Sequence, residues 1–246
     1  MNSSVLIHTG GNEVTYDDLQ KIGTPPATDT WTPIPHAALL SAVRSEMIGA
    51  GLVIQRESLA VSSSAKGTFG DRFFGLMEMR GDDEVFGLTI GVRNSHDRSI
   101  VAGLCVGSRV FVCDNLAFSA EIVIARRHTR FIERDLPRLI NQAVGCLGDL
   151  RQRQGERIDA YRRTEITDSQ FHDLTVRALD AGVICASKIP KVLQEYRHPE
   201  HEDFAPRTVW SGFNSFTEVL KGTDLQDLPR RTQSLHGLCD LLSRVN

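Results

Sequence analysis

The sequence has few cysteines and no long apolar run. Its five cysteines include no CxxC pair, which argues against a disulfide framework or a zinc ribbon. No segment approaches the roughly 20 apolar residues of a membrane-spanning helix, so we expect no membrane contact. The first residues lack a basic segment followed by an apolar core. We therefore expect no signal peptide, and a cytoplasmic location with reduced thiols.

A strong net charge is also absent, since the formal charge is −3 over 246 residues. The charge is unevenly distributed, however. Residues 126–163 hold ten arginines, no lysine and five acidic residues, a local charge of +5, whereas the rest carries 18 basic and 26 acidic residues. Arginine suits bidentate phosphate binding, so this segment is a candidate phosphate-binding surface. A solvated helix face with internal ion pairs accounts for the same pattern.

Proline content and apolar periodicity divide the chain into three parts. We expect residues 1–35 to be irregular, because four prolines interrupt any helix there. We expect residues 36–163 to be an α+β core, with a helix at 36–50, strands at 52–61, 72–79, 85–94, 109–113 and 120–125, and one long helix after Phe131. We expect residues 164–246 to be a helical C-terminal subdomain, with a capping box at Thr167–Gln170 and later helices at 188–197, 207–221 and 228–244.

The order of these elements predicts an α+β fold. Strands rich in Val, Ile and Phe come first and helices follow, which is typical of a mainly antiparallel β-meander with helices on one face. An N-terminal helix and the long basic helix would pack on this sheet. The segment 99–107, SIVAGLCVG, has no clear period, and we predict a short helix lying against the sheet.

Three polar signatures lie within this strand region: GVRNSHDRS (91–99), RVFVCDN (109–115) and RRHT (126–129). Buried polar groups must find partners, so the signatures predict either a polar site or satisfied turns. The main candidates fall at strand ends, where side chains can leave the core. We therefore expect one shared cleft on one side of the sheet, formed by His96, Asp97, Arg109, Asn115 and His128.

The residue types in these signatures suit two chemistries. An imidazole and a carboxylate on one loop can transfer protons, which makes His96, Asp97 and His128 candidate catalytic residues. The arginines are candidate phosphate contacts: Arg93, Arg98, Arg109, Arg126, Arg127 and Arg130. The remaining polar candidates are Asn94, Ser95, Ser99, Asn115 and Thr129, although such residues also form ordinary turns.

Metal binding and aromatic stacking have less support in the sequence. No pair among His96, Asp97, Cys113 and His128 has the close spacing of a structural zinc site. We therefore expect no metal and no cofactor. The aromatic residues beside the signatures are interpreted as core, so no row of exposed aromatic rings is predicted: Phe111, Phe118 and Phe131.

Together the signatures resemble those of the phage/plasmid-like protein family of unknown function (domain-of-unknown-function family nine hundred and thirty-two). The resemblance rests on TWTPIPHAALLSAV, NSHDRS, RVFVCDNLAFS and RRHT, and on VWSGFNSFTEVLKG followed by LPRRTQSLHGLCDLL. The family has no assigned reaction. It implies a mobile-element setting, often beside genes for recombination or single-stranded DNA handling. It also implies Gly where this chain has Arg98.

Three functional hypotheses follow. The leading one is a nucleic-acid-binding accessory of phage or plasmid recombination or replication, with single-stranded DNA as partner, because the basic strand end at 126–130 continues into the basic helix. The element order is similar to that of single-strand annealing proteins, which usually form rings, so a homo-oligomer is expected. The alternatives are a hydrolase or nucleotide-modifying enzyme using His96, Asp97 and His128, and an anti-defence or scaffold protein that binds a host or phage protein.

Overall fold

The computed structural model describes residues 11–63, 67–79, 86–110, 115–223 and 227–244. The strands are β1 (Asn12–Glu13), β2 (Ile54–Ser62), β3 (Arg72–Met79), β4 (Phe86–Ser95), β5 (Ala102–Val110) and β6 (Asn115–Arg126). The helices are α2 (Tyr16–Lys21), α3 (His36–Gly49), α4 (Ile132–Gly145), α5 (Leu147–Arg163), α6 (Asp168–Asp180), α7 (Ile189–Arg197), α8 (Val209–Val219) and α9 (Leu228–Ser243). The α+β class is as predicted.

The six strands form one sheet in the order of the sequence, each antiparallel to the next, which confirms the meander. The register brings the β2–β3 connection, the β4–β5 turn and the loop that follows β6 to one end of this sheet. Arg72 of β3 lies opposite Ser95 of β4, and Ala102 of β5 lies opposite Arg126 of β6. We call this end, with the turns and loops that leave it, the polar end of the sheet.

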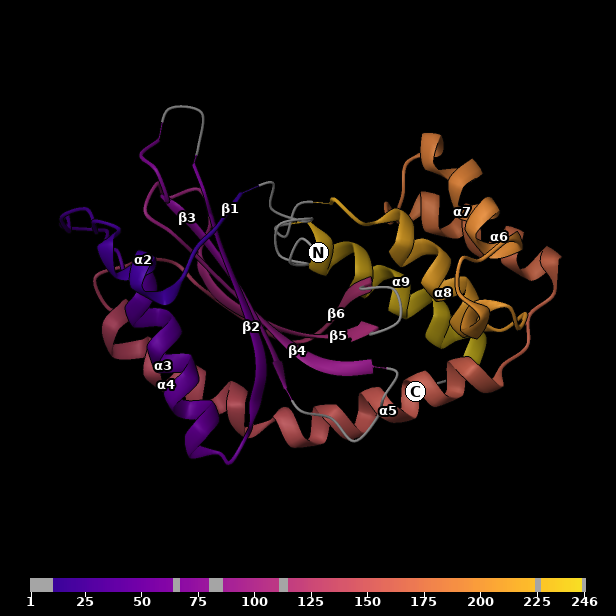
Figure 1. Cartoon of the computed structure of the whole chain (residues 1–246), viewed down its shortest axis with the longest axis horizontal. Helices are drawn as coiled ribbons and strands as arrows, with labels where there is room; N and C mark the ends of the chain where they lie inside the picture. Colours follow the sequence, from indigo (N-terminus) through magenta and orange to yellow (C-terminus); the bar gives the residue numbers. More distant parts are fainter. Residues whose placement is uncertain (1–10, 64–66, 80–85, 111–114, 224–226, 245–246) are drawn as a thin grey trace.

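Helices cover both faces of the sheet, which corrects the expectation of one covered face (Figure 1). On β3, Phe73 and Met77 pack into a core with α3 and α4. The alternate residues Phe74 and Leu76 pack into a second core with α5, α6, α8 and α9. Because both faces are buried, the strand is apolar on both sides rather than alternating.

The same two-sided burial explains why the predicted short helix at 99–107 is wrong. Most of this segment lies in β5, which pairs with both β4 and β6. Leu104 belongs to the core with α3 and α4, whereas Cys105 packs against the core on the opposite face. A central strand with apolar residues on both faces has no period-2 pattern, and a short run of this kind resembles a buried helix.

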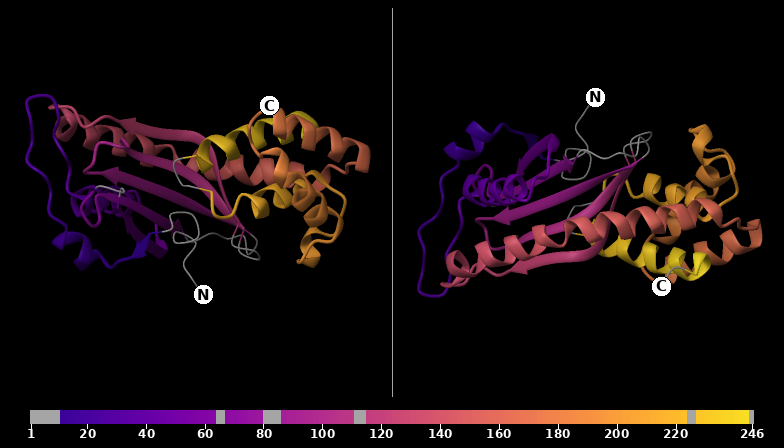
Figure 2. Two further views of the ribbon diagram at one scale, coloured as in Figure 1. Left: turned by 90° about the horizontal axis from the view of Figure 1, so that it is seen from above. Right: turned by 90° about the horizontal axis from the view of Figure 1, so that it is seen from below.

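The predicted long helix is two helices that follow one another along the molecule (Figure 2). The break falls at Cys146, which joins α4 to α5. Ile140 of α4 packs on one face of the sheet, whereas Ile158 and Tyr161 of α5 reach the core of the helical part. The pair therefore connects the two hydrophobic cores.

Two helix starts show the same capping chemistry. The predicted capping box is confirmed, since the Thr167 hydroxyl accepts from the Gln170 amide and Gln170 accepts from the Thr167 amide. An equivalent box at Thr15 and Asp18 starts α2 within residues expected to be irregular. The prolines of that segment follow α2, so they did not prevent the helix. Across the described residues, we find no helix with the length and apolar character needed to cross a membrane.

Candidate functional site at the polar end of the sheet

A cluster of buried imidazoles lies at the polar end. His36 begins α3, His96 follows β4, and His128 follows β6, so three separate parts of the chain supply them. Their exposed fractions are 1%, 7% and 5%, and Asn94 of β4 is fully buried among them. The His36 and His96 rings stack with centroids 3.9 Å apart. Two of the three candidate catalytic residues, His96 and His128, are thus brought to one cluster.

Asn94 is the centre of this cluster. Its Nδ2 donates to the Ile34 carbonyl at 2.7 Å and to His36 Nδ1 at 3.0 Å, and its Oδ1 accepts from His128 Nε2 at 2.7 Å. His36 Nε2 donates to the Gly70 carbonyl at 2.9 Å, and His96 Nε2 donates to the Ile34 carbonyl at 2.9 Å. These bonds are satisfied together when each imidazole is neutral and carries its proton on Nε2.

The surroundings of the cluster favour these neutral forms. Burial, with a smaller contribution from His96, lowers the pKa of His36 to about 3 and that of His128 to about 4. Burial also lowers the pKa of His96, although the Ile34 backbone opposes this. A histidine that works as an acid–base catalyst near neutral pH needs a pKa close to 7. The cluster instead holds the polar end together through neutral hydrogen bonds.

Asp97 forms a separate arrangement beside the cluster. Its carboxylate accepts from Arg72 Nε at 2.8 Å and from the Ser99 amide at 2.9 Å. Burial raises the pKa of Asp97, but the bonds from Ser99 and Arg72 outweigh it and hold the pKa below its usual value. Ser95 closes the same turn by donating to the Ile100 carbonyl at 2.8 Å. Asp97, Ser95 and Ser99 therefore act as turn residues.

This turn places Arg98 in a left-handed backbone conformation, with φ of 65°. Residues with a Cβ are strained there, whereas glycine is not. The conformation gives a physical reason for the glycine that the family resemblance implies at this position. The exposed Arg98 guanidinium lies 4.5 Å above the centre of the Trp31 ring, and that ring lies 6.3 Å from the His128 ring. Arg98 and Trp31 thus join the turn to the histidine cluster.

His96 and Asp97 line a cleft of about 410 Å³ at the polar end. His128 and Arg98 are not among its lining residues. Besides His96 and Asp97, the cleft is lined by Ile22, Gly23, Thr24, Pro25, Gly67, Thr68, Phe69 and Asp71.

The expectation that Arg109 and Asn115 share this cleft is wrong. Arg109 lies seven residues along β5 from Ala102, about 23 Å away at ~3.3 Å per residue. Asn115 pairs with Val110 at the same remote end of the sheet. The sequence RVFVCDN therefore spans the end of β5 and the start of β6, at the far end of the meander. Its Cys113 and Asp114 lie outside the described residues.

The candidate arginines differ in their surroundings. Arg93 is half-buried within β4, and Arg126 is half-buried in an ion pair with Asp135 and a 3.5 Å contact to Thr129. Arg127 and Arg130 are exposed. These last two, with Arg98, have the access that a phosphate contact requires.

An exposed aromatic ring lies beside them, contrary to the interpretation of Phe131 as core. Phe131 is 41% exposed at the start of α4. The guanidinium groups of Arg130 and Arg134 lie over its ring at 4.6 Å and 4.7 Å from the centre. We call Arg127, Arg130, Phe131 and Arg134 the arginine edge. The loop carrying Trp31 reaches this region, since the Thr32 amide donates to the His128 carbonyl at 3.0 Å.

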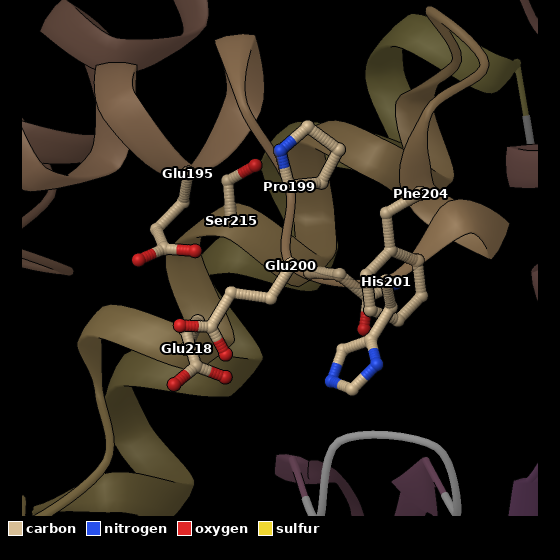
Figure 3. A pocket seen from close by; sticks show the side chains of 8 residues that line it. Glu195, Pro199, Glu200, His201, Phe204, Ser215 and Glu218 are labelled. Atoms are coloured by element: carbon tan, nitrogen blue, oxygen red, sulfur yellow. The ribbon is translucent and has the colours of Figure 1, made fainter.

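A pocket in the helical part has the opposite character (Figure 3). Glu195, Glu200 and Glu218 line it, with the Lys221 ammonium 2.6 Å from the Glu218 carboxylate. Burial raises the pKa of Glu195, and the charges of Glu218 and Glu200 raise it further. No group of three or more His, Cys, Asp or Glu side chains is placed to hold a metal ion within the described part of the chain. Three carboxylates would repel a phosphate group from this pocket.

Reasoning from the sequence missed three residues of the polar end. His36 and Trp31 lie in TWTPIPHAALLSAV, where the proline spacing indicated only the start of a helix. Arg72 begins β3 and was not distinguished from other strand-end residues. One feature of the sequence does point to Trp31 and His36, because both lie in a segment that carries the family resemblance.

Comparison with known proteins gives one finding. A protein-family model described as Domain of unknown function (DUF932) matches residues 27–236. The match spans the histidine cluster, the turn at Asp97, the arginine edge and most of the helical part. No curated protein and no solved structure matches the chain.

Proposed function

The chain belongs to the family defined by the domain of unknown function DUF932, which assigns it no activity, and we propose that it binds single-stranded DNA through the arginine edge. In the mobile-element setting that the sequence resemblance implies, such binding would serve phage or plasmid recombination or replication. The observation that carries this proposal is Phe131 lying between two exposed arginines.

The contacts of the arginine edge suit a nucleic-acid strand. Stacking on Phe131 holds the Arg130 and Arg134 guanidinium planes in place. Arg134 Nε donates to the Asp135 carboxylate at 2.9 Å, so the remaining N–H groups of Arg134, together with those of Arg130, are the ones that can meet phosphate oxygens. Because both guanidinium groups lie over the Phe131 ring, a base would stack on the outer face of a guanidinium plane, and such stacking is tolerant of base sequence. A groove that combines cations with aromatic rings is the usual means of binding single strands.

Two neighbouring features add to this surface. No side chain caps the start of α4. The Ile132 amide donates to the Thr129 carbonyl, so the next backbone N–H groups and the positive end of the helix dipole are what favour an anion there, beside the acidic Glu133 and Asp135 of the first turn. Arg98 above Trp31 supplies a second stacked cation, connected to the edge through His128. A strand along the polar end would meet both stacked arginine groups.

The alternative of a His/Asp/His enzyme has less support. The Nε2 protons of His96 and His128 are used in structural hydrogen bonds, and burial keeps both imidazoles neutral. The Asp97 carboxylate is held by Arg72 and Ser99 and orients neither imidazole. A general base is normally oriented by a third group, as in a catalytic triad.

The proposal is tested by replacing Arg127, Arg130 and Arg134 together with alanine. We expect a loss of about tenfold or more in affinity for a single-stranded oligonucleotide, measured by fluorescence anisotropy, because phosphate contacts are removed. All three side chains are exposed, so the loss of their contacts with Phe131 and Asp135 should lower the unfolding temperature only slightly and leave the protein folded. Arg177→Ala is the matched control, since Arg177 is an exposed arginine on α6. Equal affinities for the triple variant and the wild type would overturn the proposal.

A further inference from the structure

The cleft lined by His96 and Asp97 is not used in the function proposed above. The loop at 22–25 forms one wall and the segment 67–71 forms another. A volume of about 410 Å³ lies within the range of roughly 300–1,000 Å³ that is typical of small-ligand sites. The cleft is therefore large enough to enclose a small planar group.

The charge of the cleft excludes a phosphate group. Asp71 and Asp97 are among the lining residues, and no lysine or arginine is among them. The nearby Arg72 guanidinium is paired with Asp97. An occupant must therefore be neutral or cationic, and carboxylate oxygens accept hydrogen bonds from its N–H groups.

One wall of the cleft carries an unused acceptor. His96 is 7% exposed, and the bond from its Nε2 to Ile34 leaves Nδ1 with a lone pair. Nδ1 is buried and no side chain or backbone group meets it in hydrogen-bond geometry, although the backbone of Gly23, which also lines the cleft, lies close enough to raise the pKa of His96. An unpaired buried acceptor is costly, and a donor on a ligand would satisfy it.

The rim of the cleft carries an aromatic ring. Phe69 is 61% exposed although it is a large apolar side chain. A planar heterocycle that enters the cleft can stack on this ring while its polar edge meets the acceptors inside. Nucleobases combine an aromatic face with a polar edge in this way.

The cleft also adjoins the proposed DNA-binding surface. The turn that holds Asp97 continues directly to Arg98, which stacks on Trp31. Trp31 in turn contacts His128, two residues before Arg130 of the arginine edge. A strand with its phosphates on the arginines could therefore direct a base toward the cleft.

We propose that this cleft takes one base of the bound strand, stacked on Phe69, and selects a base with an exocyclic amino group. The inference rests on the proposed DNA binding and names the part of the strand that is recognised. Adenine, cytosine and guanine carry an amino group that can donate to Asp71, Asp97 or His96. Thymine carries none, and its carbonyl oxygens would face these acceptors.

The test compares oligo(dC) and oligo(dT) of equal length for the wild type and for Phe69→Ala. The wild type should bind oligo(dC) more tightly, by about tenfold, since a matched base edge contributes discrimination of that order. Phe69→Ala should lower the affinity for oligo(dC) about tenfold, because base–aromatic stacking is lost. In that variant the affinity for oligo(dT) should change little. Phe69→Leu, which keeps an apolar side chain but no ring, should behave as Phe69→Ala does.

Three outcomes would overturn the inference of base selection. The Arg130→Ala variant is the control that separates this inference from the proposed DNA binding. Equal affinity of the wild type for the two oligonucleotides removes base selection. If both Phe69 variants bind oligo(dC) as tightly as the wild type does, no base stacks on Phe69. If the variants lose the same affinity for both oligonucleotides, Phe69 contacts the strand without selecting a base. Arg130→Ala should lower the affinity for both oligonucleotides by the same factor. If the wild type binds neither, the proposed DNA binding itself fails.

Discussion

At the scale of single residues, Arg98 combines backbone strain with an exposed cation–π contact. Arg98→Gly and Arg98→Ala both remove the contact with Trp31, so they differ only in the cost of the left-handed conformation at φ 65°. We expect the glycine variant to have the larger free energy of unfolding, by about 1 kcal/mol. Urea unfolding of the two variants measures this difference. An alanine variant as stable as the glycine variant would show that the position is unstrained.

Asn94 is the residue on which the histidine cluster most depends. Asn94→Ala removes three hydrogen bonds. His36 Nδ1 and His128 Nε2 lose their partner, and the Ile34 carbonyl loses one of its two hydrogen bonds. We expect a loss of about 3 kcal/mol or more in the free energy of unfolding. Ser99→Ala removes one exposed hydrogen bond, from the Ser99 hydroxyl to Asp97, and should cost less than about 1 kcal/mol. Similar losses for the two variants would contradict a central role for Asn94.

The buried histidines also predict how stability depends on pH. A further histidine, His236 of α9, is also buried. The pKa is about 3 for His36 and His236 and about 4 for His128 in the folded protein, against an ordinary value of 6.5. Below pH 6.5 these histidines bind protons in the unfolded chain but not in the folded protein. Their contribution to stability is therefore fully present above pH 6.5 and falls as the pH decreases toward 4. Each histidine contributes up to about 1.4 kcal/mol per pH unit to the slope. Urea unfolding at pH 7 and pH 5 measures the change, and equal stability at both would refute it.

At the scale of elements, the helix pair α4–α5 contains three glycines whose added Cβ would meet nothing within 4 Å: Gly145, Gly148 and Gly155. Alanine at each should raise the free energy of unfolding by roughly 0.5–1 kcal/mol, because glycine loses more backbone freedom in a helix.

Gly212 of α8 is also a helical glycine, but it has no space for an added Cβ. Its added Cβ would lie 3.2 Å from Phe171 Cε2 in a closely packed core. Gly212→Ala should therefore lower stability, since overpacking a core is costly. Thermal or urea unfolding of the four variants measures the contrast. A gain for Gly212→Ala, or losses along α4–α5, would contradict this account of the packing.

The elements differ in how far the sequence could predict them. The strand at Arg72–Met79 and the helix starting at His36 were predicted at nearly the observed bounds. The strand containing Leu104 and Cys105 was missed because helices cover both of its faces and erase the alternation. Local patterns cannot show which faces of a sheet are covered.

The candidate site divides in the same way. The signatures NSHDRS and RRHT did identify His96, His128 and the exposed arginines. Arg109 and Asn115 were misplaced, because a meander sends successive turns to opposite ends of its sheet. His36 and Phe131 acquire their importance only through tertiary contacts with Asn94 and with two arginines. Each of these contacts depends on the packing of separate elements.

At the scale of the whole molecule, opposite charges gather in different places. The arginine edge lies at the polar end of the sheet, whereas the pocket of Glu195, Glu200 and Glu218 lies in the helical part (Figure 3). A net charge of −3 would not by itself attract a polyanion. Binding of DNA therefore requires local contacts between arginines and phosphates, and such contacts release counterions.

The most direct test is the salt dependence of single-stranded DNA affinity for the wild type and for the variant lacking Arg127, Arg130 and Arg134. If about three phosphates are neutralised, the logarithm of the association constant should fall with the logarithm of salt concentration at a slope of about −2. The triple variant keeps Arg98, so it should bind more weakly and show a clearly shallower slope. A wild type that binds no oligonucleotide at low salt, or identical slopes for the two proteins, would contradict binding through the arginine edge.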